Sequence, residues 1–252
     1  MHDTAHTLGR QFFACYWQSS FADVVELGSL NVNGSLRDHC PKGAAYLGLD
    51  SVDGPGVDRV VDWDAPLPLA DASADVVLSS SALEHDPCFW QSFLEMLRLL
   101  RPGGLLYLNA PSNHDFHRHP VDCWRFYPDA GHALVRWANR HGRAVELVES
   151  FVAAPQAQGW SDFVAVFRLG GGNPLVRRGR MADALESHNG YDIDSPHKLL
   201  REDQRTYDRQ ERERLQARLD GTRAELDPAY QAILAPKEEL RALQGRADGT
   251  AA

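Results

Sequence analysis

One turn constrains the fold of this chain more than any other feature of its sequence. Within residues 23–34 an apolar run ends at Glu26, with glycines at Gly28 and Gly34. This order is typical of a buried parallel strand that turns sharply into a helix beside a small polar ligand, because glycine allows positive φ and a helix start offers free N–H groups. The alternative is a purely structural turn. The dinucleotide fingerprint G-x-G-x-x-G is absent, which disfavours a nicotinamide or flavin cofactor.

Three further apolar runs each end in a polar residue. They are predicted strands that finish at Asp50, Asp62 and Ser80. Ligands of open parallel sheets bind beyond the carboxyl ends of the strands, so four such ends in succession predict one crevice. Asp50 follows the first turn by about twenty residues, the position of a ribose ligand in nucleotide-type sites.

The chain resembles the class I S-adenosylmethionine-dependent methyltransferases over residues from about 20 to 170. Four segments carry the resemblance in order: VVELGSLNVNG, YLGLD, DWDAPLPLADASADVVLSSSALEHDP and LLRPGGLLYLNAPS. The last two are similar to blocks of the small-molecule branch. This chain departs from the family's E-x-G-x-G-x-G pattern at two places. Leu30 stands where the family has its second glycine, and Gly34 comes two residues later than the family's third glycine. The departure predicts a longer loop.

The resemblance implies S-adenosyl-L-methionine as cofactor and assigns residues to it. Glu26 and Gly28 would contact the methionyl end, Asp50 the ribose, and Asp62 the adenine amino group. The implied cofactor set also contains Ser29, Trp63, Ser80 and Ser81, of which the last two would line the methionine side.

Composition limits which partners we expect for the protein and where in the cell we expect it. The length of 252 residues suits one α/β domain with an extension, and the net charge of −9 disfavours nucleic acid, which requires a basic surface. No apolar run is long enough for a membrane span, and no signal peptide is recognisable. The four scattered cysteines form no C-x-x-C pair, so we expect a cytoplasmic protein with reduced thiols.

The predicted architecture is α/β, a Rossmann-like seven-stranded, mostly parallel sheet with its last strand antiparallel and helices on both faces. Helical spacing predicts helices at 7–19, 89–100 and 128–142, and the first would pack on the sheet or serve as a lid over the cofactor. Residues 1–170 form the predicted methyltransferase domain and 171–252 a C-terminal helical extension. Pro228 and Pro236 should divide that extension into segments, which are a candidate homodimer interface. Residues 245–252 should be disordered.

The loop at residues 111–128 is predicted to govern the acceptor, because it follows the fifth strand at the carboxyl edge of the sheet. It is rich in polar and aromatic groups, and its candidate substrate-binding residues are His114, His117, Asp122, Trp124, Arg125 and Tyr127. The same loop resembles one in methyltransferases encoded with glycan and secondary-metabolite pathways.

Three interpretations compete for the histidines of this loop. A histidine could be the general base, and His119 and His85 are the two candidates, which the sequence cannot order. The loop histidines with Asp115 and Asp122 could instead chelate a metal, although the spacing is a weak signal and we assign no metal ligand. Finally, they could only pin the loop through hydrogen bonds and stacking.

The sequence therefore predicts methyl transfer from S-adenosylmethionine to an oxygen or nitrogen of a small polar acceptor, with a sugar or sugar-bearing metabolite as the best guess. One alternative is methylation of a macromolecule. The other is a non-catalytic binding or scaffold protein that keeps the fold.

Overall fold

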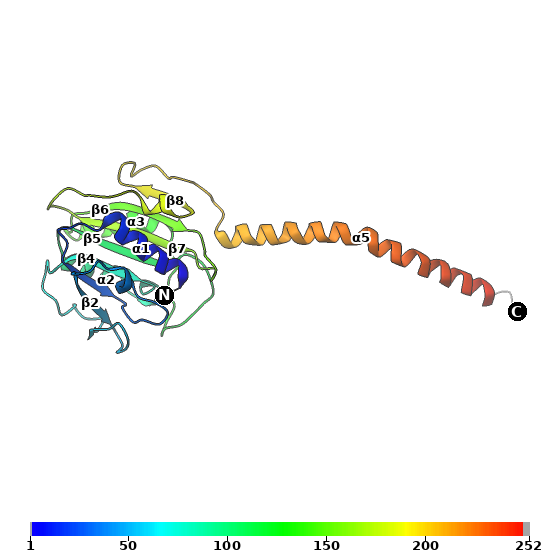
Figure 1. Ribbon diagram of the computed structural model, residues 1–252, viewed down its shortest axis with the longest axis horizontal. Coiled ribbons are helices and arrows are strands. Elements are labelled where there is room, and N and C mark those ends of the chain that lie inside the picture. Colours follow the sequence, from blue (N-terminus) through cyan, green and yellow to red (C-terminus); the bar gives the residue numbers. More distant parts are fainter. Residues whose placement is uncertain (1, 249–252) are drawn as a thin grey trace. The chain divides into compact units, whose positions relative to one another are not determined.

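The computed structural model describes residues 2–248, with side chains to residue 237. Within these residues one sheet contains eight strands in the order β3-β2-β1-β4-β5-β7-β6-β8 (Figure 1). The strands are β1 (Asp23–Leu27), β2 (Ala45–Asp50), β3 (Arg59–Val60), β4 (Ala74–Ser80), β5 (Leu100–Pro111), β6 (Val145–Ala153), β7 (Asp162–Leu169) and β8 (Ser187–Asp192).

The predicted mixture of parallel and antiparallel strands is confirmed. Strands β1 to β5 pair in parallel, whereas β7 runs antiparallel to both β5 and β6. The predicted count of seven is one short, because β8 adds an antiparallel edge strand beside β6. Its sequence, Ser-His-Asn-Gly-Tyr-Asp, is rich in residues that strands usually avoid, so it gives no strand signal.

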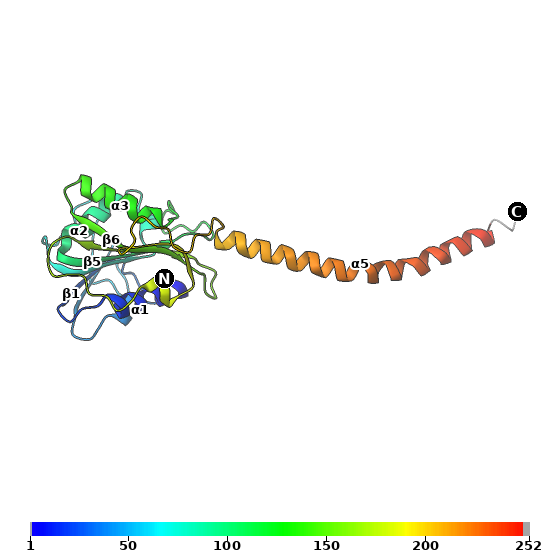
Figure 2. The same cartoon turned by 90° about the horizontal axis from the view of Figure 1, so that it is seen from above.

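Helices cover the two faces of the sheet unequally. Figure 2 shows α1 (Asp3–Tyr16) on one face and both α2 (Phe89–Leu99) and α3 (Asp129–Arg140) on the other. The core beneath α2 and α3 includes Phe93, Met96 and Leu134, and the core beneath α1 includes Phe12 and Tyr16. Helix α1 starts and ends earlier than the predicted 7–19. Its apolar stripe packs on the sheet, which was one of the two predicted roles for this helix.

No α-helix lies between β1 and β2, which corrects the prediction of a sharp strand-to-helix turn. Residues 28–35 form a loop that ends in the short 3-10 helix η1 (Leu36–His39), which Ser35 caps through Arg37 N. The loop contains two asparagines and two glycines, which favour turns over helix interiors. The predicted longer loop is therefore present, and the free helix start is not.

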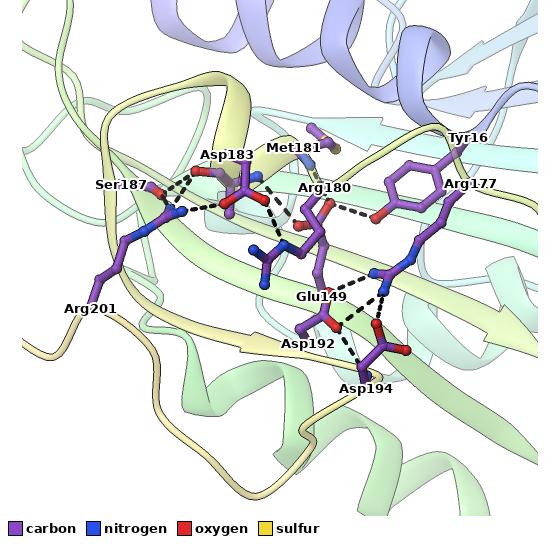
Figure 3. Close-up of polar contacts among 11 residues, drawn as sticks. Tyr16, Glu149, Arg177, Arg180, Met181, Asp183, Ser187, Asp192, Asp194 and Arg201 are labelled. Atoms are coloured by element: carbon purple, nitrogen blue, oxygen red, sulfur yellow. Dashed lines mark hydrogen bonds and ion pairs between the residues drawn. The ribbon is translucent and has the colours of Figure 1, made fainter.

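The segment after β7 belongs to the compact unit, which extends to Gln204, whereas we placed the boundary at residue 170. Short helix α4 (Met181–Ala184) and β8 fasten this segment to the sheet (Figure 3). Buried Glu149 of β6 accepts hydrogen bonds from Tyr16 Oη at 2.6 Å and Met181 N at 2.9 Å. Arg177 adds an ion pair with Asp192 of β8 at 2.6 Å. Residues 171–204 thus help to cover the face that has only one long helix.

The second unit begins at Arg205 and consists mainly of α5 (Tyr207–Asp248), a helix of 42 residues. The predicted breaks at Pro228 and Pro236 are wrong, because the helix continues through both. It also continues through residues 245–248, where we predicted disorder, and the rest of that prediction lies outside the described residues. Its side chains from Tyr207 to residue 237, which are those that the structure describes, are almost all exposed, including Leu219, Leu226 and Ile233. Neither this helix nor another in the described part of the chain has the length and apolar character to cross a membrane.

Candidate functional site

The carboxyl ends of β1, β2, β4 and β5 lie at one edge of the sheet, since these four strands are adjacent and parallel. Polar residues at this edge are buried in spite of their character. Among them are Glu26 on β1, Asp50 on β2, Ser80 on β4 and Asn109 on β5. The sequence prediction that these strand ends form one polar edge therefore agrees with the sheet order.

Glu26 lies beside an aromatic and a cationic group. Its carboxylate accepts a hydrogen bond from Tyr46 Oη at 2.7 Å, and the Arg37 guanidinium lies 4.7 Å from the centre of the Tyr46 ring. Burial raises the pKa of Glu26 to about 7, with Tyr46 and Arg37 only partly opposing that effect. A buried carboxylate at this place is ready to respond to a cationic ligand.

Gly28 is required by the contact between two strand ends. Its φ is +85°, and a Cβ added there would lie 2.4 Å from Ala82 Cβ, in the turn that follows β4. The glycine therefore lets the β1 and β4 turns touch. The close approach of the backbone at this position is therefore toward Ala82.

The backbone N–H groups at the start of the glycine loop, from Gly28 to Asn31, are occupied, contrary to the prediction that they are free. Gly28 N and Ser29 N both donate to Leu49 O, at 2.9 and 3.1 Å. Leu30 N donates to the Asp50 carboxylate at 2.9 Å, and Ser51 N donates to the other oxygen of that carboxylate at 2.7 Å. Asp50 thus connects the β2 end to the glycine loop in addition to any role toward a ligand.

Several buried polar atoms near these strand ends have no hydrogen-bond partner among the described residues. They are the hydroxyls of Ser29, Ser79 and Ser81 and the indole N–H of Trp63. Such groups are costly unless a ligand or water satisfies them. The Ser80 hydroxyl, in contrast, donates to Asn109 Oδ1 at 2.9 Å. Asp62 is exposed and accepts from Asp64 N.

A recess of about 160 Å³ adjoins this group. It lies between the segment after β3 and helix α2, and its lining consists of Leu27, residues 63–67, Gln91, Ser92 and Glu95. Trp63 therefore supplies both an aromatic wall and, in its indole N–H, an unused donor. The combination suits a flat ring with polar edges.

A chain of polar contacts continues across the edge toward β7. Asn109 Nδ2 donates to Asp162 Oδ2 at 3.0 Å, and the other oxygen of Asp162 lies 3.2 Å from His2 Nε2. His2 stacks on Trp160, which precedes β7, and His114 stacks on Trp160 with centroids 4.1 Å apart. His2, Trp160 and Asp162 were not predicted from the sequence as site residues. The predicted antiparallel pairing of β7 with its neighbours was the signal, because it brings the start of β7 to this edge.

Three histidines from two segments gather above the ends of β4 and β5. The ring centroid of His85, in the 3-10 helix η2 (Leu83–His85), lies 5.0 Å from that of His117 and 5.9 Å from that of His119. The two loop rings are 6.2 Å apart. Burial lowers the pKa of His85, although the bond between its Nδ1 and Val121 O opposes that effect. Both predicted base candidates therefore belong to one cluster.

The loop that carries this cluster is held from within. Asp122 accepts two bonds from the Arg125 guanidinium, at 2.6 and 2.9 Å, and one from His117 N at 2.8 Å. The Arg125 bonds in particular lower the pKa of Asp122 to about 2. Trp124 donates from its indole N–H to Asp86 O at 2.8 Å. Three predicted substrate ligands thus have strong partners inside the protein, whereas the predicted ligand Tyr127 is exposed.

Glu84 lies beneath the histidines and was not assigned a role from the sequence. It is 1% exposed, and its Oε2 has no hydrogen-bond partner among the residues described. Burial raises the pKa of Glu84 to about 8, although a bond from its own backbone N–H opposes that effect. Its Oε1 lies 3.7 Å from His85 Nε2. The signal was available, because Glu84 sits inside the Leu-Glu-His motif.

Comparison with known proteins finds methyltransferases that are similar to part of this chain. Residues 44–108 match a family described as a methyltransferase domain. The chain is 56% identical over 128 residues to an uncharacterized methyltransferase of Mycobacterium bovis, covering 50% of this chain and 47% of that protein. It is 37% identical over 128 residues to one of Mycobacterium ulcerans, with the same coverage. The chain thus spans about half the length of these curated relatives.

A solved structure shares the fold. It is the 1,6-didemethyltoxoflavin-N1-methyltransferase of Burkholderia thailandensis, determined with 1,6-didemethyltoxoflavin and S-adenosylhomocysteine bound. The TM-score is 0.50 at 15% sequence identity, over 67% of this chain and 77% of that one. At this identity the similarity shows the Rossmann-like fold alone.

Proposed function

We propose a function from the premise that this chain carries a class I S-adenosylmethionine-dependent methyltransferase domain. The protein transfers a methyl group from S-adenosylmethionine to an oxygen or nitrogen of a small polar acceptor, and a sugar or sugar-bearing metabolite is our best candidate. The observation that carries the proposal is a buried polar edge, formed by the ends of β1, β2, β4 and β5, with a histidine cluster above it.

The residues at this edge fit the cofactor. The unpartnered hydroxyls of Ser29 and Ser81 and the indole N–H of Trp63 would hydrogen-bond it, Glu26 would face its ammonium group, and Asp50 its ribose. The predicted ligands Gly28, Asp62 and Ser80 complete the proposed set. When bound, the cofactor supplies an electrophilic methyl group on a sulfonium.

The chain's own part in the reaction is to orient the acceptor and to take its proton. A histidine whose pKa is near neutral suits that task, because an unprotonated imidazole is then abundant at neutral pH. His85 and His119 remain the two candidates, and both lie in the cluster. His114 and His117 would bind the acceptor beside them, and Tyr127 would do so from its exposed position. Strong hydrogen bonds within the protein occupy Asp122, Trp124 and Arg125. These bonds favour a role in which the three residues hold the loop in place for the acceptor.

We also infer the protein's location in the cell and its state of assembly. The four cysteines are free, which supports a cytoplasmic location. Helix α5 presents Leu219, Leu226 and Ile233 at intervals of seven residues, all of them exposed, and this spacing supports a homodimer through α5.

The non-catalytic alternative is supported by one specific observation. All the N–H groups from Gly28 to Asn31 are used within the chain, and no α-helix starts between β1 and β2. A protein that had lost cofactor binding would tolerate this closed loop. The alternative predicts no affinity for the cofactor.

Calorimetry with S-adenosylhomocysteine decides between the two. We expect micromolar binding with one site per chain in the wild-type protein. Ser81→Ala should weaken binding, because it removes a donor that has no other partner, while Ser20→Ala, at an exposed turn after α1, should not. A folded wild-type protein without measurable affinity would refute the proposed function.

A further inference from the structure

We propose that Glu84, His85 and His117 bind a zinc ion. One potential ligand atom from each of the three lies within 4.8 Å of the others, and they come from two segments of the chain, η2 and the loop after β5. Two imidazoles and a carboxylate are a ligand set that zinc takes in proteins, usually with a fourth position left to water or a substrate.

Both histidines are oriented for metal binding by their other ring nitrogen. His85 Nδ1 lies 2.5 Å from Val121 O, an acceptor, so this nitrogen carries the hydrogen and Nε2 keeps its lone pair. His117 Nδ1 lies 3.3 Å from Asp115 O and 3.4 Å from the Asp122 carboxylate, which fixes the same tautomer. Metal-binding histidines in general make this kind of contact with a carbonyl or carboxylate. Two Nε2 atoms are thereby left as acceptors.

Glu84 provides the independent observation that a cation belongs here. Its side chain is 1% exposed and its Oε2 has no hydrogen-bond partner in the described part of the chain. Its Oε1 lies 3.7 Å from His85 Nε2, which is the atom that we assign to the metal. A buried carboxylate of this kind is costly without a partner, and a bound zinc ion would satisfy it together with the two imidazoles.

The present spacing is slightly wider than that of a bound site. Zinc bonds of about 2.0 to 2.2 Å place tetrahedral ligand atoms about 3.3 Å apart. Because the three ligand atoms lie within 4.8 Å of one another, they would have to close by at most about 1.5 Å. His117 is the ligand that can move, because its side chain is 30% exposed, whereas Glu84 is enclosed. His119 lies near enough to serve as a fourth ligand or to stay free as a base.

These ligands differ from the metal donors considered from the sequence. Asp122 is saturated by Arg125, Asp115 is exposed, and His114 stacks on Trp160. Of that set His117 belongs to the proposed triad, and His119 lies close enough to add a fourth ligand. The use of the metal rests on the proposed function: a zinc ion here would lower the pKa of an acceptor hydroxyl bound at its open position. It would also assign His85 as a ligand and leave His119 as the base candidate.

The test is zinc binding by the full-length chain after removal of metals with a chelator, measured by calorimetry without cofactor. We expect one zinc ion per chain for the wild type. His117→Ala and Glu84→Gln should each weaken binding by roughly 100-fold or more, since even loss of an outer partner of a ligand costs 10- to 100-fold. His141→Ala, at an exposed histidine after α3, is the control and should bind as the wild type does.

Circular dichroism on each variant establishes that it is folded. His117 is partly exposed, so His117→Ala keeps the test valid if the buried Glu84→Gln does not fold. Wild-type protein that binds no stoichiometric zinc, or a folded His117→Ala that binds it unchanged, would overturn the proposal. Zinc binding is measured separately from binding of S-adenosylhomocysteine, so failure of one proposal is distinguishable from failure of the other.

Discussion

Replacing Glu26 with glutamine should make the protein more stable at pH 8 but not at pH 4. The pKa of Glu26 is raised from 4.5 to about 7, mainly by burial. At about 1.36 kcal/mol for each pKa unit, this difference corresponds to about 3 kcal/mol in the free energy of unfolding. Glutamine has the same shape, has no charge to desolvate, and can still accept the hydrogen bond from Tyr46 Oη.

The direction of the pH dependence follows from proton binding. Between pH 4.5 and 7 the unfolded chain releases the Glu26 proton while the native protein retains it, so rising pH favours the unfolded state over this window. Below pH 4.5 both states hold the proton and the penalty is absent. Above pH 7 the penalty is complete. The difference between Glu26→Gln and wild type should therefore grow from near zero at pH 4 to about 3 kcal/mol at pH 8.

Urea denaturation at several pH values measures the free energy of unfolding of each protein. The difference between the two values at each pH removes the contribution of the groups that both proteins share. Tyr46, Arg37 and Asp50, which surround the carboxylate electrostatically, are unchanged in the variant. A difference that stays constant with pH, or that favours the wild type at pH 8, would refute the reasoning. Under the proposed function the same variant should bind S-adenosylhomocysteine more weakly, so the acidic residue would cost stability and contribute affinity.

The other expectations concern the proposed cofactor, the base and the domain boundary. Asp50→Ala should weaken S-adenosylhomocysteine binding at least tenfold, since a hydrogen bond to a charged group contributes roughly 1.5 to 3 kcal/mol; calorimetry with Asp53→Ala as control checks this, and unchanged affinity in the folded variant contradicts it. His119→Ala should lower turnover roughly 100-fold with cofactor affinity within a few-fold, as measured in a methyl-transfer assay on acceptors found by screening, and full turnover would exclude His119 as the base. A chain ending at Gln204 should remain folded and bind the cofactor, whereas one ending at Gly170 should be destabilised because it lacks β8 and the Met181 N bond to Glu149; thermal melting of both chains compares them, and equal stability would show that residues 171–204 are dispensable.

The strands of the parallel half were predictable because burial leaves a plain signal. Runs such as Ala74–Ser80 consist of apolar residues that only a sheet covered on both sides can bury, and the structure places that strand at the same residues. The polar residues at the strand ends followed from the same argument. Helix α2 was equally clear, since its apolar residues repeat at helical spacing.

What could not be predicted depends on contacts between distant segments. The glycine loop forms no helix because its N–H groups find acceptors on β2, such as Leu49 O, which local sequence does not reveal. Strand β8 exists because β6 offers an edge, and its own residues have low strand propensity. Similarly, Glu84 and His117 are 33 positions apart in the sequence, so their proximity emerges only when the loop after β5 folds back over η2.

The stack of His2, Trp160 and His114 has a practical consequence for handling the protein. The two ring pairs have interplanar angles of 14° and 12°, and His117 meets the edge of the same tryptophan. The second residue of the chain is thus a wall of the candidate site. A fusion partner joined directly before His2 would crowd this wall, so binding and activity should be measured after an amino-terminal purification tag has been removed.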